Sequence, residues 1–412
     1  MHVNLKTKSL YCFVTVTLIF VIFYLNNTSY LKKTEIEIPR VTNRPYHKIT
    51  TEEITIYTRP RTKTRYILLW TNPNSYPFAY FGEGNSVFKN KKCEYNNCYV
   101  TSNRQLLRDY TEYDVIAFNG PQLIEITSSD DLPKVRTFRQ KYVYANVEAA
   151  ANYPICQNNW DNFFNWTWTY KLDSDAIWGY IAVFNTSNHV IGPSTDMDWM
   201  SVDDMSPIDK ELKQKLASKT KAGAWFASNC NTLSKREEFV NEVQTYLKDF
   251  DLKIDVYGSC GTFQCPKSIM PRCLEELERN YYFYFAFENA ISEDYVTEKI
   301  LYALDHYTVP VVYGGADYSR YLPPGSYLNA YQLGAKDLAT EIYDILENRE
   351  IYYRYFRWRK YYILRRRHES PRTDEYCRFC AMINDDDLMA EKTIYKNFSA
   401  WWTPAGLCGK NK

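Results

Sequence analysis

Five polar side chains lie within twelve residues in the second half of the chain. They are an acid, an amide, a phenol, a second acid and a cation: Glu288, Asn289, Tyr295, Glu298 and Lys299. Carboxylates accept hydrogen bonds from sugar hydroxyls, and a lysine ammonium binds phosphate as a compact charge. Together these groups suit a ribose, a sugar ring and a diphosphate.

A strand, a helix and a second strand must position these side chains. Residues 281–287 form an apolar and aromatic run with the length and β-propensity of a buried strand. A polar turn follows at 288–294, apolar side chains recur at helical spacing over 295–305, and residues 309–313 are a second apolar run. This order predicts a right-handed βαβ unit of a parallel sheet, in which ligands bind beyond the carboxyl ends of the strands.

The same segment resembles the α1,3-fucosyltransferase motif of glycosyltransferase family 10, F-Y-x-x-F-E-N followed after a short spacer by D-Y-[VI]-T-E-K. Every fixed position of the motif is present: Phe283, Tyr284, Phe287, Glu288, Asn289, Asp294, Tyr295, Val296, Thr297, Glu298 and Lys299. The resemblance implies an α/β fold of the GT-B type, two Rossmann-like domains facing a cleft. It also implies that GDP-β-L-fucose is the donor and that transfer inverts the anomeric carbon.

Other stretches extend the resemblance over about residues 140–327. Residues 165–175 are similar to the family's N-W-T-x-x-Y-[RK]-x-D-S-D, and a strand expected at 142–146 leads to Glu148. The family's acid is followed by Ser-Pro, whereas this chain has Ala149-Ala150. The second half also has the family's W-x-x-S-N strand exit, helix-opening Arg and D-V-[YF]-G strand, at Trp225, Ser228, Asn229, Arg236, Asp255, Val256, Tyr257 and Gly258.

An inverting transfer needs a base for the acceptor hydroxyl and groups that stabilise the departing diphosphate. The resemblance implies that Glu148 is the base, on the acceptor side. It implies that Arg236 and Lys299 bind the diphosphate, since a guanidinium fork and an ammonium both suit phosphate oxygens. Glu298 fits ribose hydroxyls; alternatively, it only balances the charge of Lys299.

The remaining donor-binding candidates have assigned or alternative roles. Tyr284 is expected at the nucleotide and Asn229 at the phosphates or the base. Tyr295 contacts the donor or packs in the core. Glu288 and Asn289 shape the fucose pocket or anchor the turn.

Three acidic clusters raise the possibility of a metal site: Asp173-Ser174-Asp175, Asp196-Met197-Asp198 and residues 385–387. A D-x-D triplet at a strand end holds Mn²⁺ in the GT-A fold of transferases. Because the candidate phosphate-binding cations lie much later in the chain, we expect Asp173–Asp175 to be structural or on the acceptor side. No metal ligand and no required cofactor are expected; stimulation by Mn²⁺ or Mg²⁺ stays open.

The chain has 412 residues and a net charge of +1. Its length predicts two domains, and its charge gives no indication of nucleic-acid binding. The predicted organisation is a cytosolic tail (1–9), a transmembrane helix (10–25), a stem (26–64), an N-terminal acceptor-binding domain (65–205), a C-terminal GDP-fucose-binding domain (206–370) and a disulfide-containing tail (371–412).

The N-terminal apolar run predicts the location of the protein. Residues 10–25 are uncharged, and Lys6 and Lys8 precede them, which favours a cytosolic N-terminus. A cleaved signal peptide is the alternative, but no small-x-small cleavage site follows the run. We expect an uncleaved signal anchor, and hence a single-pass type II Golgi membrane protein with a lumenal catalytic domain.

Ten cysteines remain outside the apolar run, an even number compatible with complete pairing in an oxidising compartment. Cys377 and Cys380 form a C-x-x-C that could hold zinc, but the only rival pair, Cys260 and Cys265, is poorly spaced for it. The family resemblance agrees with disulfides for these four cysteines, without defining the pairs. Ser292 stands where the core-type branch of the family often has Cys.

The candidate glycosylation sites are Asn185 and Asn397, whereas the sequon at Asn165 lies in the N-W-T motif and is expected to be too buried. The Cys-Gly-x-x-x-Cys-Pro and C-x-x-C segments are similar to the core-type branch. The resemblance therefore implies transfer to the asparagine-linked N-acetylglucosamine of glycoprotein N-glycans. The alternatives are a Lewis-type enzyme acting on N-acetyllactosamine, a metal-dependent GT-A transferase and an inactive glycan-binding membrane protein.

Overall fold

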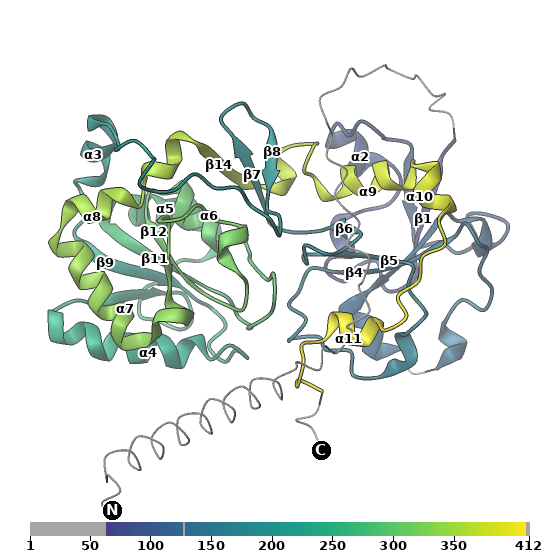
Figure 1. The fold of residues 1–412 in the computed structure, drawn as a ribbon. Coiled ribbons are helices and arrows are strands. Elements are labelled where there is room, and N and C mark those ends of the chain that lie inside the picture. Colours follow the sequence, from purple (N-terminus) through teal and green to yellow (C-terminus); the bar gives the residue numbers. More distant parts are fainter. Residues whose placement is uncertain (1–62, 127, 409–412) are drawn as a thin grey trace, which may run out of the picture. The chain divides into compact units, whose positions relative to one another are not determined.

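The computed structural model describes residues 63–126 and 128–408, which form two parallel sheets and one small antiparallel sheet (Figure 1). The run at residues 10–25 and nearly all of the predicted stem lie outside the described residues. Within the described part of the chain, no helix combines the length and hydropathy needed to cross a bilayer.

The first sheet is formed by the N-terminal half of the chain and has the order β2-β1-β3-β4-β5-β6, with all neighbours parallel. The strand predicted at 142–146 is confirmed as β4. The six strands are β1 Arg65–Leu69, β2 Cys98–Thr101, β3 Val115–Asn119, β4 Lys141–Asn146, β5 Trp166–Thr169 and β6 Ala176–Ile177.

The second sheet is also parallel and has the order β10-β9-β11-β12-β13. Strands β11 and β12 have the predicted bounds. The strands are β9 Lys221–Phe226, β10 Ile254–Tyr257, β11 Tyr281–Phe287, β12 Val309–Tyr313 and β13 Leu328–Asn329. The protein is therefore an α/β protein with parallel sheets, as predicted.

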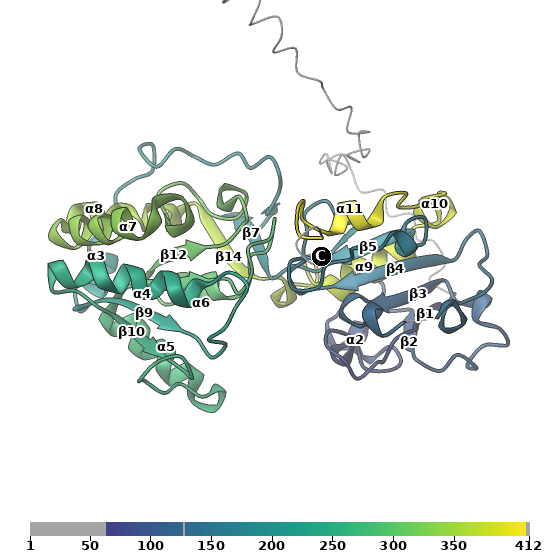
Figure 2. The ribbon, with the colours of Figure 1, turned by 90° about the horizontal axis from the view of Figure 1, so that it is seen from below.

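Alternate side chains of β11 face two different helix layers. Phe283, Phe285 and Phe287 pack with α4 (Arg236–Leu247), α7 (Ala330–Glu347) and α8 (Arg349–Arg354). Tyr284 and Ala286 pack with α5 (Met270–Asn280) and α6 (Lys299–Asp305) on the other face. Helices α4 and α7 lie side by side across the second sheet in both views (Figures 1 and 2). Both faces of β11 are covered, which explains its continuous apolar sequence.

The helix predicted over residues 295–305 begins later, at Lys299. Asp294 has a left-handed backbone (φ 57°), and the backbone N–H of Thr297 is bonded to the Glu288 side chain instead of to a helical carbonyl. Tyr295 and Val296 are apolar because they are buried in an irregular segment. Their spacing matches that of a helix, but this segment is not helical.

The C-terminal segment covers both faces of the first sheet. Helix α9 (Glu375–Ile383) and α10 (Asp386–Ala390) pack on one face, and α11 (Phe398–Trp402) packs on the other (Figure 1). The third sheet joins β14 (Tyr362–Arg366) to β7 (Ile181–Asn185) and β8 (Val190–Gly192). The remaining α-helices of the described residues are α2 Ser86–Asn90 and α3 Lys210–Leu216.

Five disulfides pair all ten cysteines of residues 93–408, so Cys260, Cys265, Cys377 and Cys380 are confirmed in disulfides. Cys377 is not bonded to Cys380, nor Cys260 to Cys265. Instead, Cys377 and Cys380 bond to Cys93, which precedes β2, and to Cys98, the first residue of β2, and so tie α9 to the first sheet. The pairs are Cys93–Cys377, Cys98–Cys380, Cys156–Cys408, Cys230–Cys260 and Cys265–Cys273. The zinc alternative for the C-x-x-C is therefore wrong.

The first turn of α9 has a carboxyl group that should make stability depend on pH. Burial, followed by the charge of Asp374, raises the pKa of Glu375 from 4.5 to about 7. The folded state binds this proton more tightly than the unfolded chain. The stability that this proton contributes is fully present below about pH 4.5 and is lost as the pH rises through about 7.

Glu375→Gln should remove this loss. The variant should be more stable than the parent above pH 7, by at most about 3 kcal/mol, and the difference should vanish toward pH 5. Chemical denaturation of a soluble 63–412 fragment at pH 5 and pH 8, with disulfides intact, measures it. Glu242→Gln, on the exposed side of α4, is the control. Equal free energies of unfolding for Glu375→Gln and the parent at pH 8 would contradict the assignment.

Candidate active site

The predicted donor-binding side chains gather around the carboxyl ends of two neighbouring strands. Asn229 follows β9, and Glu288 and Asn289 follow β11. Arg236 and Lys299 are the first residues of α4 and α6. The carboxyl edge of a parallel sheet is the usual ligand position in α/β folds, and the amino end of a helix such as α4 favours anions.

Glu288 is completely buried and organises the turn after β11. Its carboxylate accepts hydrogen bonds from the Thr297 backbone N–H at 2.8 Å and from the Thr297 hydroxyl at 2.9 Å, and Lys299 Nζ donates to Oε2 at 3.0 Å. Lys299 also donates to the Thr297 hydroxyl at 2.7 Å. Of the two interpretations of Glu288, the geometry favours the one in which it anchors the turn.

Lys299 is held as a cation by two carboxylates. Burial alone would lower its pKa, but Glu288 and Glu298 outweigh burial and raise the pKa above its ordinary value. Nζ lies 3.8 Å from Glu298 Oε1, and the side chain of Glu298 is 38% exposed. Glu298 is therefore the accessible carboxylate of the motif, with room to accept bonds from ligand hydroxyls.

Arg236 is also buried beside the end of β11. Its Nη1 donates to the Phe287 carbonyl at 2.6 Å and its Nη2 to the Asn229 carbonyl at 3.3 Å. Burial lowers its pKa, and the charge of Glu288 opposes this effect. Nε of Arg236 and Oδ1 of Asn289 are buried without a hydrogen-bond partner within residues 63–126 and 128–408. Unsatisfied buried polar atoms are costly, so a donor and an acceptor here are consistent with a polar ligand.

The other two donor-binding candidates differ in accessibility. Asn229 is exposed. Tyr284 is 1% exposed inside the sheet, with its ring against Phe226 and Tyr302. Burial, and then the influence of Tyr302 and the charge of Glu298, raise the pKa of Tyr284 well above its ordinary value. Tyr284 therefore lies beneath the charged groups, whereas Asn229 lies at the surface.

Glu148 lies two residues beyond β4 of the first sheet and contacts the motif of the second. The hydroxyl of Tyr295 donates to Glu148 Oε2 at 3.3 Å. The ring of Tyr295 is buried edge-on against Tyr170, with centroids 5.0 Å apart. Tyr295 thus packs in the core and reaches the site. Burial raises the pKa of Glu148 above 4.5, although the Tyr295 bond and the charge of Lys299 oppose the rise.

Two hydrogen bonds join the loops that follow β4 and β5 to the segment between β11 and α6. The N–H of Ala151, three residues after Glu148, donates to Ser292 Oγ at 3.1 Å, and the N–H of Leu172 donates to Asp294 Oδ2 at 3.1 Å. Ser292, at the position where a Cys was a family expectation, thus serves as a hydrogen-bond acceptor. Glu148, Lys299 and Arg236 are linked electrostatically, because the charge of Lys299 affects Glu148 and that of Arg236 affects Lys299.

Two supporting residues were not given roles from the sequence. The Thr297 hydroxyl bridges Glu288 and Lys299, and the Ser234 hydroxyl donates to the Glu288 carbonyl at 2.8 Å. Thr297 is a fixed position of the D-Y-[VI]-T-E-K motif, which was a signal for a role. Ser234 has no comparable signal, because a single hydroxyl between two elements leaves no pattern in the sequence.

The Asp173–Asp175 carboxylates are used inside the protein. Asp173 accepts from the Trp401 indole at 2.8 Å, and Asp175 accepts from the Thr167 backbone N–H at 2.9 Å and from the Tyr395 hydroxyl at 2.9 Å. These contacts favour the structural interpretation. Asp385 similarly caps α10. The group of three potential metal ligands found in the described residues is Cys93, Asp374 and Cys377, whose cysteines form a disulfide.

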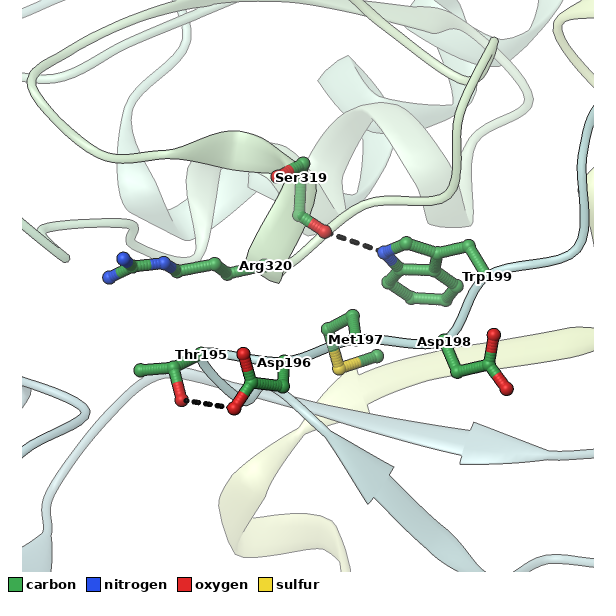
Figure 3. Close-up of a pocket in the computed structure, with 7 residues that line it drawn as sticks. All are labelled: Thr195, Asp196, Met197, Asp198, Trp199, Ser319 and Arg320. Carbon is green, nitrogen blue, oxygen red and sulfur yellow. Dashed lines mark hydrogen bonds between the residues drawn. The ribbon is translucent and has the colours of Figure 1, made fainter. Parts of the chain in front are cut away.

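A separate pocket of about 440 Å³ includes none of the candidate site residues. The Trp199 indole donates to the Ser319 carbonyl in its wall, and the carboxylates of Asp196 and Asp198 do not point toward one another (Figure 3). It is lined by Thr195, Asp196, Met197, Asp198, Trp199, Ser319 and Arg320.

The sequons differ in accessibility. The side chain of Asn165 is hydrogen-bonded inside the protein: its Oδ1 accepts from the Tyr142 backbone N–H and its Nδ2 donates to the Thr393 carbonyl. Asn397 is exposed at the start of α11, and Asn185 is partly exposed at the end of β7. These positions agree with the choice of Asn185 and Asn397.

Comparison with known proteins identifies two family models. "Fucosyltransferase, N-terminal" matches residues 62–181, and "Glycosyltransferase family 10 (fucosyltransferase) C-term" matches residues 216–401. Alpha-(1,3)-fucosyltransferase C of Drosophila melanogaster is 33% identical over 82% of this chain and 78% of the relative. Glycoprotein 3-alpha-L-fucosyltransferase A of the same organism is 28% identical over 79% of this chain and 58% of the relative.

A human relative and a solved structure are also similar. The human 3-galactosyl-N-acetylglucosaminide 4-alpha-L-fucosyltransferase FUT3 is 30% identical over 74% of this chain and 75% of the relative. A crystal structure of an alpha1,3-fucosyltransferase with GDP aligns with a TM-score of 0.47 and 15% identity, over 84% of this chain and 96% of that chain.

Proposed function

Because the chain belongs to glycosyltransferase family 10, and is therefore a fucosyltransferase of the α1,3-fucosyltransferase family, we propose that it transfers L-fucose from GDP-β-L-fucose in α1,3 linkage to glycoprotein N-glycans. The proposed acceptor is the asparagine-linked N-acetylglucosamine. This choice is supported by the core-type segments at Cys260–Cys265 and Cys377–Cys380. The name of the second Drosophila relative supports a glycoprotein acceptor.

The observation that carries the proposal is the proximity of one buried and one partly buried cation to a partly buried acid. Arg236 and Lys299 would bind the diphosphate of GDP-fucose, with the unpartnered Nε of Arg236 and a further N–H of Lys299 as donors. Asn229 would contact the phosphates or the base, and Glu298 the ribose hydroxyls. Asn289, with its unpartnered Oδ1, would contact the fucose.

Glu148 would act as the base of an inverting displacement. Its carboxylate takes the proton of the acceptor hydroxyl while that oxygen bonds to the anomeric carbon of fucose, and the bond from this carbon to the diphosphate oxygen breaks. GDP leaves with the bonding electrons, and its added negative charge is stabilised by Arg236 and Lys299. A pKa raised by burial makes Glu148 a stronger base than an exposed glutamate.

The proposal includes a fold type, a location and the absence of a required metal. We assign the protein to GT-B, with the β1–β6 sheet on the acceptor side and the β9–β13 sheet on the donor side. Residues 10–25 would anchor it in the Golgi membrane with a lumenal catalytic part, which agrees with five disulfides. The cations named above would neutralise the diphosphate without Mn²⁺ or Mg²⁺.

The test is mass spectrometry of a core N-glycopeptide after incubation of the soluble 63–412 fragment with GDP-fucose. We expect a gain of one deoxyhexose on the innermost N-acetylglucosamine, and the same gain in EDTA. A gain only when divalent metal is added would contradict the metal-free proposal. Absence of any gain on this or any other glycan acceptor would contradict the function.

A peripheral, Lewis-type acceptor is the second candidate. It is favoured by a relative of Gorilla gorilla gorilla named 4-galactosyl-N-acetylglucosaminide 3-alpha-L-fucosyltransferase FUT5, which is 29% identical over 84% of this chain. Incubation with free N-acetyllactosamine in parallel with the glycopeptide separates the two. Fucose on N-acetyllactosamine, with none on the core sugar, would select the peripheral function.

A further inference from the structure

Two exposed tyrosines follow the first strand of the first sheet. Tyr76 is 44% exposed and Tyr80 is 66% exposed, and their rings lie edge to face with centroids 5.0 Å apart. Their neighbours Phe78 and Phe81 are buried in the core beside the sheet. The buried phenylalanines therefore anchor this loop, while the two tyrosine rings stay accessible to solvent.

The tyrosine pair lies at the same edge of the sheet as Glu148. Strands β1, β3 and β4 are parallel neighbours, so their carboxyl ends share one edge. Asn119, the last residue of β3, donates from Nδ2 to the Tyr76 carbonyl at 2.9 Å, and this bond fixes the loop against that edge. Although Tyr76 remains 44% exposed, its partial burial, followed by the influence of Tyr80 and the charges of Glu148 and Glu298, raises its pKa to about 12. The Tyr76 hydroxyl is thus a neutral donor in the electrostatic field of the candidate base.

We propose that Tyr76 and Tyr80 form an aromatic platform that receives the acceptor sugar next to Glu148. A pyranose ring has an apolar C–H face, which stacks on an aromatic ring, and polar edges, which need hydrogen bonds. The exposed ring of Tyr80 supplies the face, and the hydroxyl of Tyr76 supplies a donor toward the edge of the sugar. This inference rests on the proposed function, because it names the residues that select the acceptor of that same site.

The test compares acceptor and donor kinetics in variants of the soluble 63–412 fragment, with the core N-glycopeptide as acceptor. Tyr80→Ala should raise the acceptor KM about tenfold, whereas Tyr80→Phe, which keeps the stacking face, should raise it much less. The KM for GDP-fucose and the slow hydrolysis of GDP-fucose without acceptor should change less than twofold in both variants. Because Tyr80 is largely exposed, its replacement should preserve the melting temperature.

Phe138→Ala is the matched control. Phe138 is 70% exposed but precedes β4 by three residues, so it lies at the opposite edge of the sheet from Glu148. This variant should keep the parent's acceptor KM. If Tyr80→Ala transfers fucose with the parent's acceptor KM, the platform is wrong and the proposed function stands. If the parent hydrolyses GDP-fucose but transfers no fucose to the acceptor, the proposed function is wrong, and the platform proposal is wrong with it.

Discussion

Glu148→Gln is expected to lower kcat for fucose transfer by about three orders of magnitude, within the range measured for loss of a general base. The amide is the same size as the carboxylate and can still accept the bond from Tyr295, but it takes no proton from the acceptor hydroxyl. The KM for GDP-fucose should stay close to that of the parent, because the cations that would hold the diphosphate belong to other loops. Initial rates over a range of both substrates measure the effect.

The pH profile gives a second readout of the same assignment. Burial raises the pKa of Glu148 above 4.5, so activity should fall as the pH drops through this raised value. The bond from Tyr295 opposes the rise, so Tyr295→Phe should move the acidic limb of kcat to higher pH. A merely structural role for Tyr295 would leave the limb in place.

Glu94→Gln is the control for Glu148→Gln. Glu94 is exposed and precedes β2, so it lies toward the opposite edge of the first sheet. This control should keep full activity. Glu148→Gln with more than a tenth of the parent's kcat would contradict the assignment of Glu148 as the base.

Arg236→Lys is expected to lower kcat/KM for GDP-fucose about a hundredfold. Lysine keeps the positive charge but loses the planar fork, which joins the carbonyls of Phe287 and Asn229 and leaves Nε for a phosphate oxygen. Loss of charge-assisted hydrogen bonds of about 1.5–3 kcal/mol each accounts for a change of this size. The affinity for GDP alone, measured by calorimetry, should weaken in parallel.

The control for Arg236→Lys is Arg108→Lys, since the Arg108 side chain is 90% exposed. This control should bind GDP as the parent does. Melting temperatures of both variants distinguish lost binding from lost folding, because Arg236 also supports the loop after β9. Parent-like affinity for GDP in folded Arg236→Lys would show that the guanidinium does not bind the diphosphate.

The sequence by itself determined the central strand, and the family resemblance indicated which polar residues to look for beyond its end. The run at 281–287 is apolar on both faces, because helices cover both sides of β11, so its length and composition were sufficient to define it. Arg236 and Glu148 were indicated by the family resemblance, and the structure places Arg236 at the start of α4 and Glu148 two residues after β4. The family motif indicated which of the polar residues near these ends mattered.

Only the tertiary structure decided what Glu288 does, where α6 begins and which cysteines pair. Glu288 is bonded to Thr297 and Lys299, nine and eleven residues later, and this contact displaces the first turn of the expected helix. Cys93 and Cys98 reach Cys377 and Cys380 across more than 280 residues. Local sequence records backbone preference and burial. It does not determine which distant group will bind a buried charge or which distant cysteine will form a disulfide, because both depend on the packing of the whole chain.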